Sequence, residues 1–351
     1  MKAILLAGGK GTRLRPLTLH TPKPIVPIFN RAFLQYQIDL LKSVPEIDEV
    51  ILSLNYQPRR IEELFGDGAG TGLKIRYVVE PNPLGTGGAI RFAAQGVDDS
   101  IVVFNGDVLT TVDLNGLIAL HRSRRALATI VLTPVDNPAA YGLVETDREG
   151  NVRRFLEKPD PTDITCNTIN AGIYVLEPST FDRIPKDVSY SIERAYFPSL
   201  VERNETFVAH VDTGYWIDIG TPQKYMQVHR DVMDGRCRVP PFASNGASVQ
   251  CAESAMIEAG ADLQGPCYVD DGAVIKAGAR ILPYSVVGKQ VHIEEGATIA
   301  GSVIWANSWI GRDSTVTDAL IGRNCSIGRN SSVRAGSVLG DKTVLTDYTR
   351  L

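Results

Sequence analysis

The N-terminal part of the chain begins with Lys2-Ala3-Ile4-Leu5-Leu6-Ala7-Gly8-Gly9-Lys10-Gly11-Thr12-Arg13-Leu14, and this segment is the main indicator of its fold. It predicts a short apolar strand that ends in a glycine-rich loop. Glycines let a backbone approach a ligand closely and turn successive N–H groups towards it. In open α/β folds, ligands bind at the carboxyl edge of a parallel sheet, where such a loop lies. Arg13 and Lys23 would add positive charge, so the loop predicts a phosphate site.

Three alternative interpretations of this loop are weaker. A dinucleotide fingerprint needs a third glycine where Leu14 stands. A Walker A loop needs a closing Gly-Lys-Ser/Thr, which is missing here. A simple tight turn would account for the glycines but not for Arg13 and Lys23, which flank the loop.

Strand and helix patterns alternate as far as about Gly235, which predicts an α/β fold with a Rossmann-like, mixed and mainly parallel sheet. The predicted strands are Ala3–Leu6, Glu49–Leu54, Ile75–Val79, Ile101–Phe104, Ala128–Thr133 and Ile173–Val175. The predicted helices are Phe33–Leu41, Pro58–Phe65, Gly88–Ala94 and Leu114–Arg124.

A different periodicity follows a proline-containing linker at 236–246. Aliphatic residues recur at a spacing of six, with an occasional five, at Val269, Ile275, Ile281, Val287, Ile293, Ile299, Ile304, Ile310, Val316, Ile321, Ile327, Val333, Val338 and Val344. Such a hexapeptide repeat predicts a parallel β-helix with the aliphatic side chains inside. A β-sandwich with regular turns would not keep so constant a phase. We therefore expect a first domain at 1–235 and a β-helix domain at 247–351.

The bulk composition is that of an ordinary globular protein, with 44% hydrophobic and 22% charged residues. A net charge of −4 argues against nucleic acid or membrane as the main partner. The five cysteines form no CxxC pair, which fits a reducing compartment. The first apolar run is too short for a signal sequence or a membrane span. We expect a cytoplasmic protein.

Six sequence blocks resemble those of the sugar-1-phosphate nucleotidylyltransferases, and they follow in that family's order over about residues 1–230. The blocks are Gly8-Gly9-x-Gly11-Thr12-Arg13-Leu14 with Pro22-Lys23-Pro24, Leu84-Gly85-Thr86-Gly87-Gly88, Phe104-Asn105-Gly106-Asp107, Glu157-Lys158-Pro159, Asn170-Ala171-Gly172-Ile173-Tyr174 and Trp216-Ile217-Asp218-Ile219-Gly220-Thr221-Pro222. Many members also carry a C-terminal left-handed β-helix. The resemblance implies a reaction between a nucleoside triphosphate and a sugar 1-phosphate that releases pyrophosphate.

The resemblance also assigns roles to residues. Catalytic residues would be Arg13, Lys23, Asp107, Lys158 and Asp218. The nucleotide would be bound by Leu6, Ala7, Gly8, Gly9, Gly11, Thr12, Arg13, Lys23, Glu80, Gly85, Thr86, Gly106 and Asp107. The sugar phosphate would be bound by Gly142, Glu157, Lys158, Asn170 and Asp218. Asp107 and Asp218, with phosphate oxygens and water, would make an octahedral Mg²⁺ site. Taken alone, Asp107 could equally cap a turn, and Glu157 and Lys158 could be a solvated surface pair.

The base-binding block is similar to that of the mannose-1-phosphate guanylyltransferases, because it lacks the glutamine common in thymidylyl- and uridylyltransferases. Glu80 is a possible acceptor for guanine N–H groups, and Gly85, Gly87 and Gly88 would leave room for a purine. The expected product is therefore GDP-mannose, made from GTP and mannose 1-phosphate. A glucose-1-phosphate thymidylyl- or uridylyltransferase and a heptose-1-phosphate guanylyltransferase are the alternatives within the family.

Two other classes of function fit the sequence less well. A non-catalytic regulatory subunit would have no need for all five catalytic residues. A β-helix acyltransferase would need a catalytic histidine, but His292 lies between two aliphatic residues and is expected to be a structural, outward-facing side chain. We instead expect the β-helix to mediate homo-oligomerisation.

Overall fold

The computed structural model describes residues 1–242 and 248–351. These residues form two compact units, each built from two segments of the chain. The first unit combines Met1–Gly9 with Leu34–Trp216, and the second combines Lys10–Phe33 with Ile217–Leu351. The glycine-rich loop is thus divided between the units, which a split at residue 235 does not anticipate. Residues 243–246 of the expected linker lie outside the described part.

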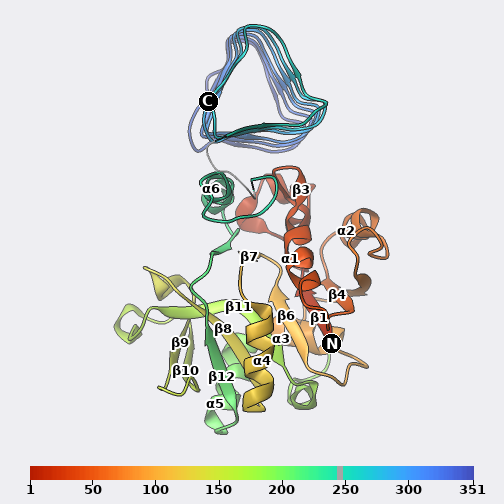
Figure 1. The fold of residues 1–351 in the computed structure, drawn as a ribbon, viewed down its shortest axis with the longest axis vertical. Coiled ribbons are helices and arrows are strands. Elements are labelled where there is room, and N and C mark those ends of the chain that lie inside the picture. The colour runs from red at the N-terminus through yellow and green to blue at the C-terminus, as the bar shows by residue number, and fades with distance from the viewer. Residues whose placement is uncertain (243–247) are drawn as a thin grey trace. The chain divides into compact units, whose positions relative to one another are not determined.

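A nine-stranded mixed sheet forms the centre of the first unit (Figure 1). Its strands are β1 (Lys2–Leu6), β4 (Glu49–Leu54), β5 (Lys74–Val79), β6 (Ile101–Asn105), β8 (Ala128–Pro134), β9 (Gly142–Thr146), β10 (Val152–Glu157), β11 (Thr168–Leu176) and β12 (Phe207–Val211). The order is β10-β9-β11-β6-β1-β4-β5, with β8 paired to β11 and β12 paired to β8. The strands β6, β1, β4 and β5 run parallel, whereas β11 is antiparallel to β6. The predicted α/β class and all six predicted strands are confirmed.

Helices cover this sheet and seal its apolar strands. They are α1 (Phe33–Lys42), α2 (Pro58–Phe65), α3 (Gly85–Ala93), α4 (Leu114–Arg124) and α5 (Phe197–Glu202), with a π-helix at Ile192–Tyr196 directly before α5. The α4 helix begins where Asp113 accepts a hydrogen bond from the Gly116 N–H, as helix N-caps do. It packs on β8 and β12, and α3 packs on β1 and β4. Every residue of β4 is buried, which is typical of a parallel strand covered on both faces.

Most of the antiparallel half of the sheet was not predicted, although its strand β8 was. The hairpin β9–β10 and the strand β12 were not predicted, and β11 was expected only at Ile173–Val175. The pairing of β11 with β8 is interrupted by a bulge between Asn170 and Tyr174. The sequence Asn170-Ala171-Gly172 at this bulge interrupts the strand pattern, because asparagine and glycine favour turns.

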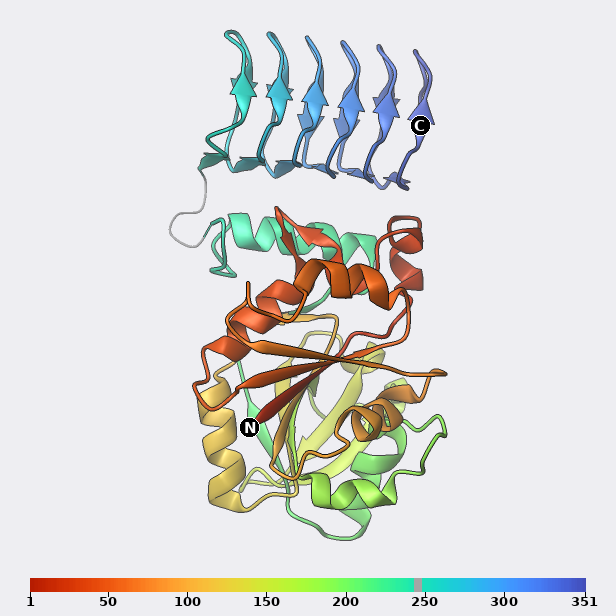
Figure 2. The same ribbon diagram turned by 90° about the vertical axis from the view of Figure 1, so that its right-hand side faces the viewer.

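The C-terminal part of the second unit is a left-handed parallel β-helix with three faces (Figures 1 and 2). The first face consists of β14 (Val249–Cys251), β17 (Cys267–Val269), β20 (Ser285–Val287), β23 (Val303–Ile304), β26 (Leu320–Ile321) and β29 (Val338–Leu339). The second consists of β15 (Met256–Ile257), β18 (Val274–Ile275), β21 (His292–Ile293), β24 (Trp309–Ile310), β27 (Ser326–Ile327) and β30 (Val344–Leu345). The third consists of β16 (Asp262–Leu263), β19 (Arg280–Ile281), β22 (Thr298–Ala300), β25 (Thr315–Thr317) and β28 (Ser332–Val333).

The aliphatic ladder of this β-helix is confirmed from Val269 to Val333, since each predicted residue is at most 1% exposed. Its continuation was predicted one residue out of register. Val338 is half-buried and Val344 is 69% exposed, whereas Leu339 and Leu345 pack against the core. Counting six residues from Val333 gives these two leucines, so the break of five that the sequence analysis placed before Val338 does not exist.

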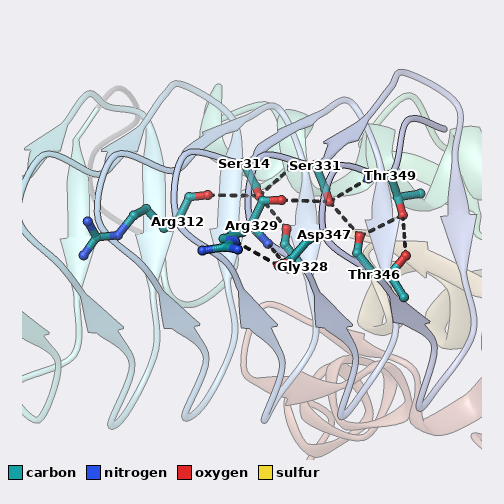
Figure 3. Close-up of polar contacts among 8 residues, drawn as sticks. All are labelled: Arg312, Ser314, Gly328, Arg329, Ser331, Thr346, Asp347 and Thr349. Atoms are coloured by element: carbon teal, nitrogen blue, oxygen red, sulfur yellow. Dashed lines mark hydrogen bonds and ion pairs between the residues drawn. The ribbon is translucent and has the colours of Figure 1, made fainter.

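Buried hydroxyl groups link the coils at one corner of the β-helix (Figure 3). Ser314 donates to the carbonyl of Gly328 at 2.7 Å and accepts from the N–H of Ser331 at 3.0 Å. One coil further on, Ser331 donates to the carbonyl of Thr346 at 3.1 Å and accepts from the N–H of Thr349 at 3.2 Å. Main-chain groups that turn away from the sheets at the corner thereby find partners, as buried polar groups must.

Two further pieces complete the second unit. The segment Lys10–Phe33 contains three short 3₁₀ turns (Thr12–Leu14, Leu17–Leu19 and Lys23–Ile25) and a two-stranded ribbon of β2 (Pro27–Ile28) and β3 (Arg31–Ala32). The α6 helix (Pro222–Met233) begins at Thr221, whose hydroxyl accepts from the Lys224 N–H. None of the helices in the described ranges is both long and apolar enough to cross a membrane.

Candidate active site

The carboxyl ends of β1, β4 and β6 lie at one edge of the sheet, where Ala7, Gly8 and Gly9 begin the predicted phosphate loop. Leu6 lies opposite Asn105, and the N–H of Gly106 donates to the carbonyl of Leu6 at 3.0 Å. A Cβ at Gly106 would lie 2.3 Å from that carbonyl oxygen, so only glycine fits here. Asp107 follows immediately, and its backbone therefore lies at this edge, as predicted. The sequence positions the carboxylate by ending a buried strand at a glycine.

The loop from Gly11 to Lys23 is held by contacts within the second unit. Gly11 has a φ of 60°, in the left-handed region that favours glycine. A Cβ at Gly11 would lie 3.0 Å from the Lys23 Cβ, so the loop packs closely on the Lys23 stem. The Thr18 hydroxyl donates to the Gly11 carbonyl at 2.7 Å. Lys23 is only 9% exposed, which marks a lysine held in place rather than a solvated surface residue.

Arg13 and Asp218 meet over Gly220 in the second unit. A Cβ at Gly220 would lie 2.8 Å from Nη2 of Arg13 and 3.0 Å from Oδ2 of Asp218. Lys224 was not among the predicted site residues, and its ammonium group forms an ion pair with Oδ1 of Asp218. Lys224 lies on the first turn of α6, six residues after Asp218. A carboxylate six residues before a lysine gives no recognisable pattern in the sequence, so only the fold identifies this partner.

The described residues contain no cluster of three or more His, Cys, Asp or Glu side chains that could hold a metal ion alone. A site that used only the carboxylates of Asp107 and Asp218 would need phosphate oxygens and water to complete its coordination. Carboxylate oxygens are the donors that Mg²⁺ prefers, and Mg²⁺ commonly binds through one or two carboxylates plus substrate phosphates. The donor chemistry of the two residues therefore fits the predicted cofactor. Asp107 belongs to the first unit and Asp218 to the second.

Glu80 anchors the segment expected to bind the base. It is 7% exposed, and its carboxylate accepts from the Ser53 hydroxyl at 3.0 Å and from the Leu84 N–H at 2.9 Å. The Glu80 carbonyl accepts from the Asn55 side chain at 3.3 Å. Both carboxylate oxygens thus already have a protein partner, and this side chain fixes the loop from 80 to 84. Each oxygen keeps one lone pair for a ligand.

The glycines of this segment have a role other than the predicted one. The expected room for a purine is filled by protein, because a Cβ at Gly85 would lie 2.8 Å from the Tyr190 carbonyl oxygen and one at Gly87 would lie 3.0 Å from the Tyr190 ring. The N–H groups of Gly87 and Gly88 donate to that carbonyl at 2.8 and 3.2 Å. The glycines let the chain around Tyr190 dock on the first turn of α3. Their absence of side chains is therefore explained by packing, and it carries no information about the base.

Thr86 connects the same turn to Glu193 on the π-helix. Its hydroxyl donates to Oε2 of Glu193 at 2.6 Å and accepts from the Ile192 N–H at 3.0 Å. The Ser191 hydroxyl also donates to Oε2 of Glu193, at 2.7 Å. Isolated π-helical turns are rare and are frequent at functional sites. No motif in the sequence pointed to Glu193.

Three of the residues expected to bind the sugar phosphate, Gly142, Glu157 and Lys158, lie at one end of the β9–β10 hairpin. Glu157 lies opposite Gly142, and a Cβ at Gly142 would lie 2.9 Å from Oε2 of Glu157. Burial raises the pKa of Glu157, and the nearby Glu193 carboxylate raises it further, whereas Lys158 lowers it. Lys158 has a φ of 54°, and its N–H donates to the Tyr141 carbonyl at 3.0 Å. Its side chain is exposed.

Asn170 lies in the β11 bulge and shapes it. Its side-chain oxygen accepts from the Gly172 N–H at 2.8 Å, and its amide donates to the Tyr174 hydroxyl at 2.9 Å. The Trp216 indole donates to the Ala171 carbonyl at 2.9 Å, and the Tyr141 ring packs edge-on against the indole at 5.5 Å. The rings of Trp216 and Tyr141 thus pack together beside the bulge. This aromatic pair was not predicted.

The predicted site residues therefore fall into two sets. The first unit brings together Gly142 with Glu157, and places Leu6, Ala7 and Gly8 on the same sheet edge as Gly106 and Glu80. The second unit brings together Gly11 with Lys23, and Arg13 with Asp218. Gly9 is the last residue of the N-terminal segment of the first unit. A Cβ added to it would have no atom within 4 Å, and both Gly9 and Thr12 are exposed.

The prediction that His292 faces outward is confirmed. His292 is exposed on the second face of the β-helix, and its ring stacks on that of Trp309 at 6.1 Å. Packing against Trp309 on the surface of the β-helix accounts for His292.

Two family descriptions match the chain. Residues 2–235 match the nucleotidyl transferase family, and residues 263–351 match the GMPPB C-terminal domain. A mannose-1-phosphate guanylyltransferase of Mycobacterium tuberculosis is 40% identical over 307 residues, which cover 86% of this chain and 79% of that protein. A probable mannose-1-phosphate guanylyltransferase of Arabidopsis thaliana is 35% identical and covers 100% of this chain and 99% of its own length.

Solved structures of similar proteins also match the chain. HddC from Yersinia pseudotuberculosis, crystallised with GMP-PN, is 30% identical and superposes with a TM-score of 0.55 over 64% of this chain and 96% of that one. A putative glucose-1-phosphate thymidylyltransferase from Bacillus anthracis has the same fold at 23% identity, with a TM-score of 0.60 over 66% of this chain and 96% of that one. The chain therefore belongs to the sugar-1-phosphate nucleotidylyltransferases, and its similarity to the mannose-1-phosphate guanylyltransferases extends through both the catalytic part and the β-helix.

Proposed function

We propose that this enzyme transfers GMP from GTP to mannose 1-phosphate, so that GDP-mannose and pyrophosphate are formed. The observation that carries the proposal is the double match: mannose-1-phosphate guanylyltransferase relatives are similar along the whole chain, and residues 263–351 match the GMPPB C-terminal domain. Both substrates are anions, and the site residues Arg13, Lys23 and Lys158 supply the positive charge that a protein with a net charge of −4 needs locally.

The reaction needs positioning and charge neutralisation rather than covalent catalysis. A phosphate oxygen of mannose 1-phosphate attacks the α-phosphorus of GTP in line, and the bond from that phosphorus to the bridging oxygen of pyrophosphate breaks. Arg13 and Lys23 would hold the triphosphate and the developing charge. Lys158 would hold the attacking phosphate, while Glu157 accepts hydrogen bonds from sugar hydroxyls. Mg²⁺, held by Asp107 and Asp218, would neutralise the phosphate oxygens.

A uridylyltransferase is the second candidate, because a relative from Synechocystis that is named UTP–glucose-1-phosphate uridylyltransferase is 33% identical over 93% of this chain. Thymidylyl transfer to glucose 1-phosphate and guanylyl transfer to a heptose 1-phosphate are the other members of this set. These reactions share one mechanism and differ in the base and sugar pockets.

The decisive experiment measures pyrophosphate release with GTP, UTP, dTTP and ATP, each against mannose, glucose and heptose 1-phosphates. The proposal expects kcat/KM for GTP with mannose 1-phosphate to exceed every other pair by at least about tenfold. A buried polar site loses affinity on that scale when the wrong base leaves groups unpaired. A tenfold preference for UTP or dTTP would instead establish the second candidate.

We further propose that the chain assembles into a homo-oligomer in the cytoplasm through its β-helix. The second face of the β-helix supports this, since Met256, Trp309 and Val344 are between 52% and 69% exposed on it. Large apolar side chains that are exposed on one face add to the apolar area that a subunit contact would bury.

A further inference from the structure

The first face of the β-helix is covered, unlike the second. Its outward residues Tyr268, Val286, Val303 and Leu320 are at most 5% exposed, although an outward residue of a solenoid normally meets solvent. The cover comes from within the second unit. It consists of the segment Lys10–Phe33, which carries the predicted phosphate ligands Arg13 and Lys23, and of the α6 helix.

Aromatic rings fasten the segment to this face. The Phe29 ring packs edge-on against the Tyr268 ring at 5.5 Å, and it also contacts the Phe242 ring at 5.3 Å. Phe29 is 4% exposed. Further along the β-helix, a Cβ at Gly340 would lie 3.0 Å from the Pro16 Cβ. The segment is therefore in contact with the β-helix near both of its ends.

A chain of hydrogen bonds runs from the β-helix to the backbone of the same segment. The Trp305 indole N–H donates to the Tyr225 hydroxyl at 2.9 Å, and that hydroxyl donates to the Pro27 carbonyl. Trp305 is 3% exposed and Tyr225 is fully buried. The Pro27 carbonyl and the Trp305 indole N–H both bond to this one hydroxyl. Removing the hydroxyl takes this partner from both groups, whereas removing the indole N–H takes one donor from the hydroxyl.

A second connection runs through His229 on α6. The Phe29 N–H donates to Nε2 of His229 at 3.2 Å, and Nδ1 donates to the Tyr225 carbonyl at 2.9 Å. This pattern requires the neutral ring with its proton on Nδ1. Burial lowers the pKa of His229 to about 4, which keeps the ring in that form at neutral pH. The contact is therefore fixed rather than switchable in the physiological range.

Only a few residues separate these hydrogen bonds from Lys23, the predicted phosphate-binding lysine. The Val26 N–H donates to the Lys23 carbonyl at 3.2 Å, and the Phe33 N–H donates to the Val26 carbonyl at 3.0 Å. Pro27 is four residues from Lys23, and the stem of Lys23 packs against Gly11. A shift of Pro27 would hence be passed to Lys23 and to the glycine loop, because the turns between them leave no flexible spacer.

We propose that Trp305 and Tyr225 are positioning residues for nucleotide binding: the β-helix holds the phosphate-binding segment, and so acts as a structural part of the triphosphate site as well as an assembly module. This inference rests on the proposed function only in taking Lys10–Phe33 as the segment that binds the triphosphate. It assigns no catalytic role to Trp305, which acts through Pro27 and Lys23.

The test compares two tryptophans of the full-length chain. Trp305→Phe keeps a ring but removes the N–H donor, and Trp309→Phe makes the same change at an exposed position. We expect Trp305→Phe to raise the KM for the nucleoside triphosphate about three- to tenfold, with less than a twofold change in the KM for the sugar phosphate, because one net hydrogen bond has about this effect. Trp309→Phe should match the wild type in both.

Tyr225→Phe provides the second arm. It breaks the same chain of hydrogen bonds at its middle, so the double variant with Trp305→Phe should bind the triphosphate no more weakly than Tyr225→Phe alone. Additive losses, or a Trp305→Phe variant that melts at a lower temperature while its triphosphate KM stays unchanged, would overturn the proposal.

Hydrogen–deuterium exchange separates this inference from the proposed function. Amides of residues 23–33 should exchange faster in Trp305→Phe than in Trp309→Phe, whether or not any substrate is turned over. A wild-type protein that turns over no triphosphate would refute the proposed function and leave this arm intact. Unchanged exchange in residues 23–33 would refute the attachment of the segment.

Discussion

The Thr86 hydroxyl donates to Oε2 of Glu193 at 2.6 Å, and this bond joins the predicted base segment to the π-helix beside the predicted sugar site. Thr86 is on the first turn of α3, which follows the segment anchored by Glu80. Glu193 lies close enough to Glu157 to raise its pKa. One side-chain contact therefore connects the regions expected to bind the base and the sugar.

Removing the Thr86 hydroxyl should weaken nucleotide binding. In Thr86→Val, Glu193 loses a donor and the Ile192 N–H loses its acceptor, at a cost of about 1–3 kcal/mol for unsatisfied buried groups. We expect the GTP KM to rise roughly five- to a hundredfold. Thr86→Ser retains the hydroxyl and should restore most of the affinity. Equal KM values for the Val and Ser variants would show that this bond does not shape the site.

Glu193→Gln should move the pH dependence of sugar-phosphate binding. Glu157 would accept hydrogen bonds from the sugar in its ionised form, and its raised pKa means that this form is lost at a higher pH than for an ordinary glutamate. Replacing the Glu193 charge removes one cause of the increase, so the pKa of Glu157 falls. The rise in mannose 1-phosphate KM on acidification should then begin at a lower pH than in the wild type.

The KM profile between about pH 4 and 8 checks this shift against Glu202→Gln, an exposed carboxylate on α5. That control should superimpose on the wild type. A Glu193→Gln profile displaced to higher pH, or not displaced, would contradict the assignment of Glu157 to the sugar.

Asp107→Asn and Asp218→Asn should each lower kcat by at least about a hundredfold at saturating Mg²⁺, because the amide cannot neutralise a divalent cation. Each variant should unfold within a few degrees of the wild type. Asp136→Asn, at an exposed position, serves as the matched control. Turnover near the wild-type rate in either site variant would remove that residue from the metal site.

Local sequence patterns predicted most of the parallel half of the sheet. The strand Glu49–Leu54 and the helices Pro58–Phe65 and Leu114–Arg124 were predicted with the bounds that the structure has. Their signals are local: a continuous apolar run in the first case, and an N-terminal proline or an Asp N-cap in the others. The hexapeptide ladder was likewise readable, since one aliphatic per strand faces the core.

Contacts between distant segments could not be predicted in this way. The approach of Tyr190 to Gly85 depends on how loops fold back, and no periodicity encodes it. The grouping of Lys10–Phe33 with the β-helix belongs to the same class, because the segment interrupts a chain that otherwise forms the first unit. The division at 235 was expected from a change in periodicity, and periodicity does not report which face a loop covers.

The corner hydroxyls should stabilise the β-helix. Ser314→Ala removes the donor to Gly328 and the acceptor of the Ser331 N–H, both at a buried corner. Unsatisfied backbone groups of this kind cost about 1–3 kcal/mol, so the unfolding midpoint of the β-helix should fall by several degrees. Ser326→Ala makes the same chemical change at an exposed position of the second face and should leave the midpoint nearly unchanged. Indistinguishable midpoints for the two variants would contradict the role of the corner.

Assembly through the β-helix is better tested by a point substitution than by the truncation that the sequence alone suggests. Deleting residues from 236 onward would also uncover Phe29 and the neighbouring segment, so a smaller particle could reflect damage to the catalytic part. Trp309→Glu instead places a charge in the middle of the second face of the β-helix. This face is exposed, whereas the first face is buried. We expect light scattering to show a smaller molar mass for this variant than for the wild type. Its kcat/KM with GTP should stay within about twofold of the wild-type value, and its unfolding midpoint should stay within a few degrees. Trp309→Phe, which keeps the apolar surface, should retain the wild-type mass. A Trp309→Glu mass equal to that of the wild type would place any subunit contact elsewhere on the chain.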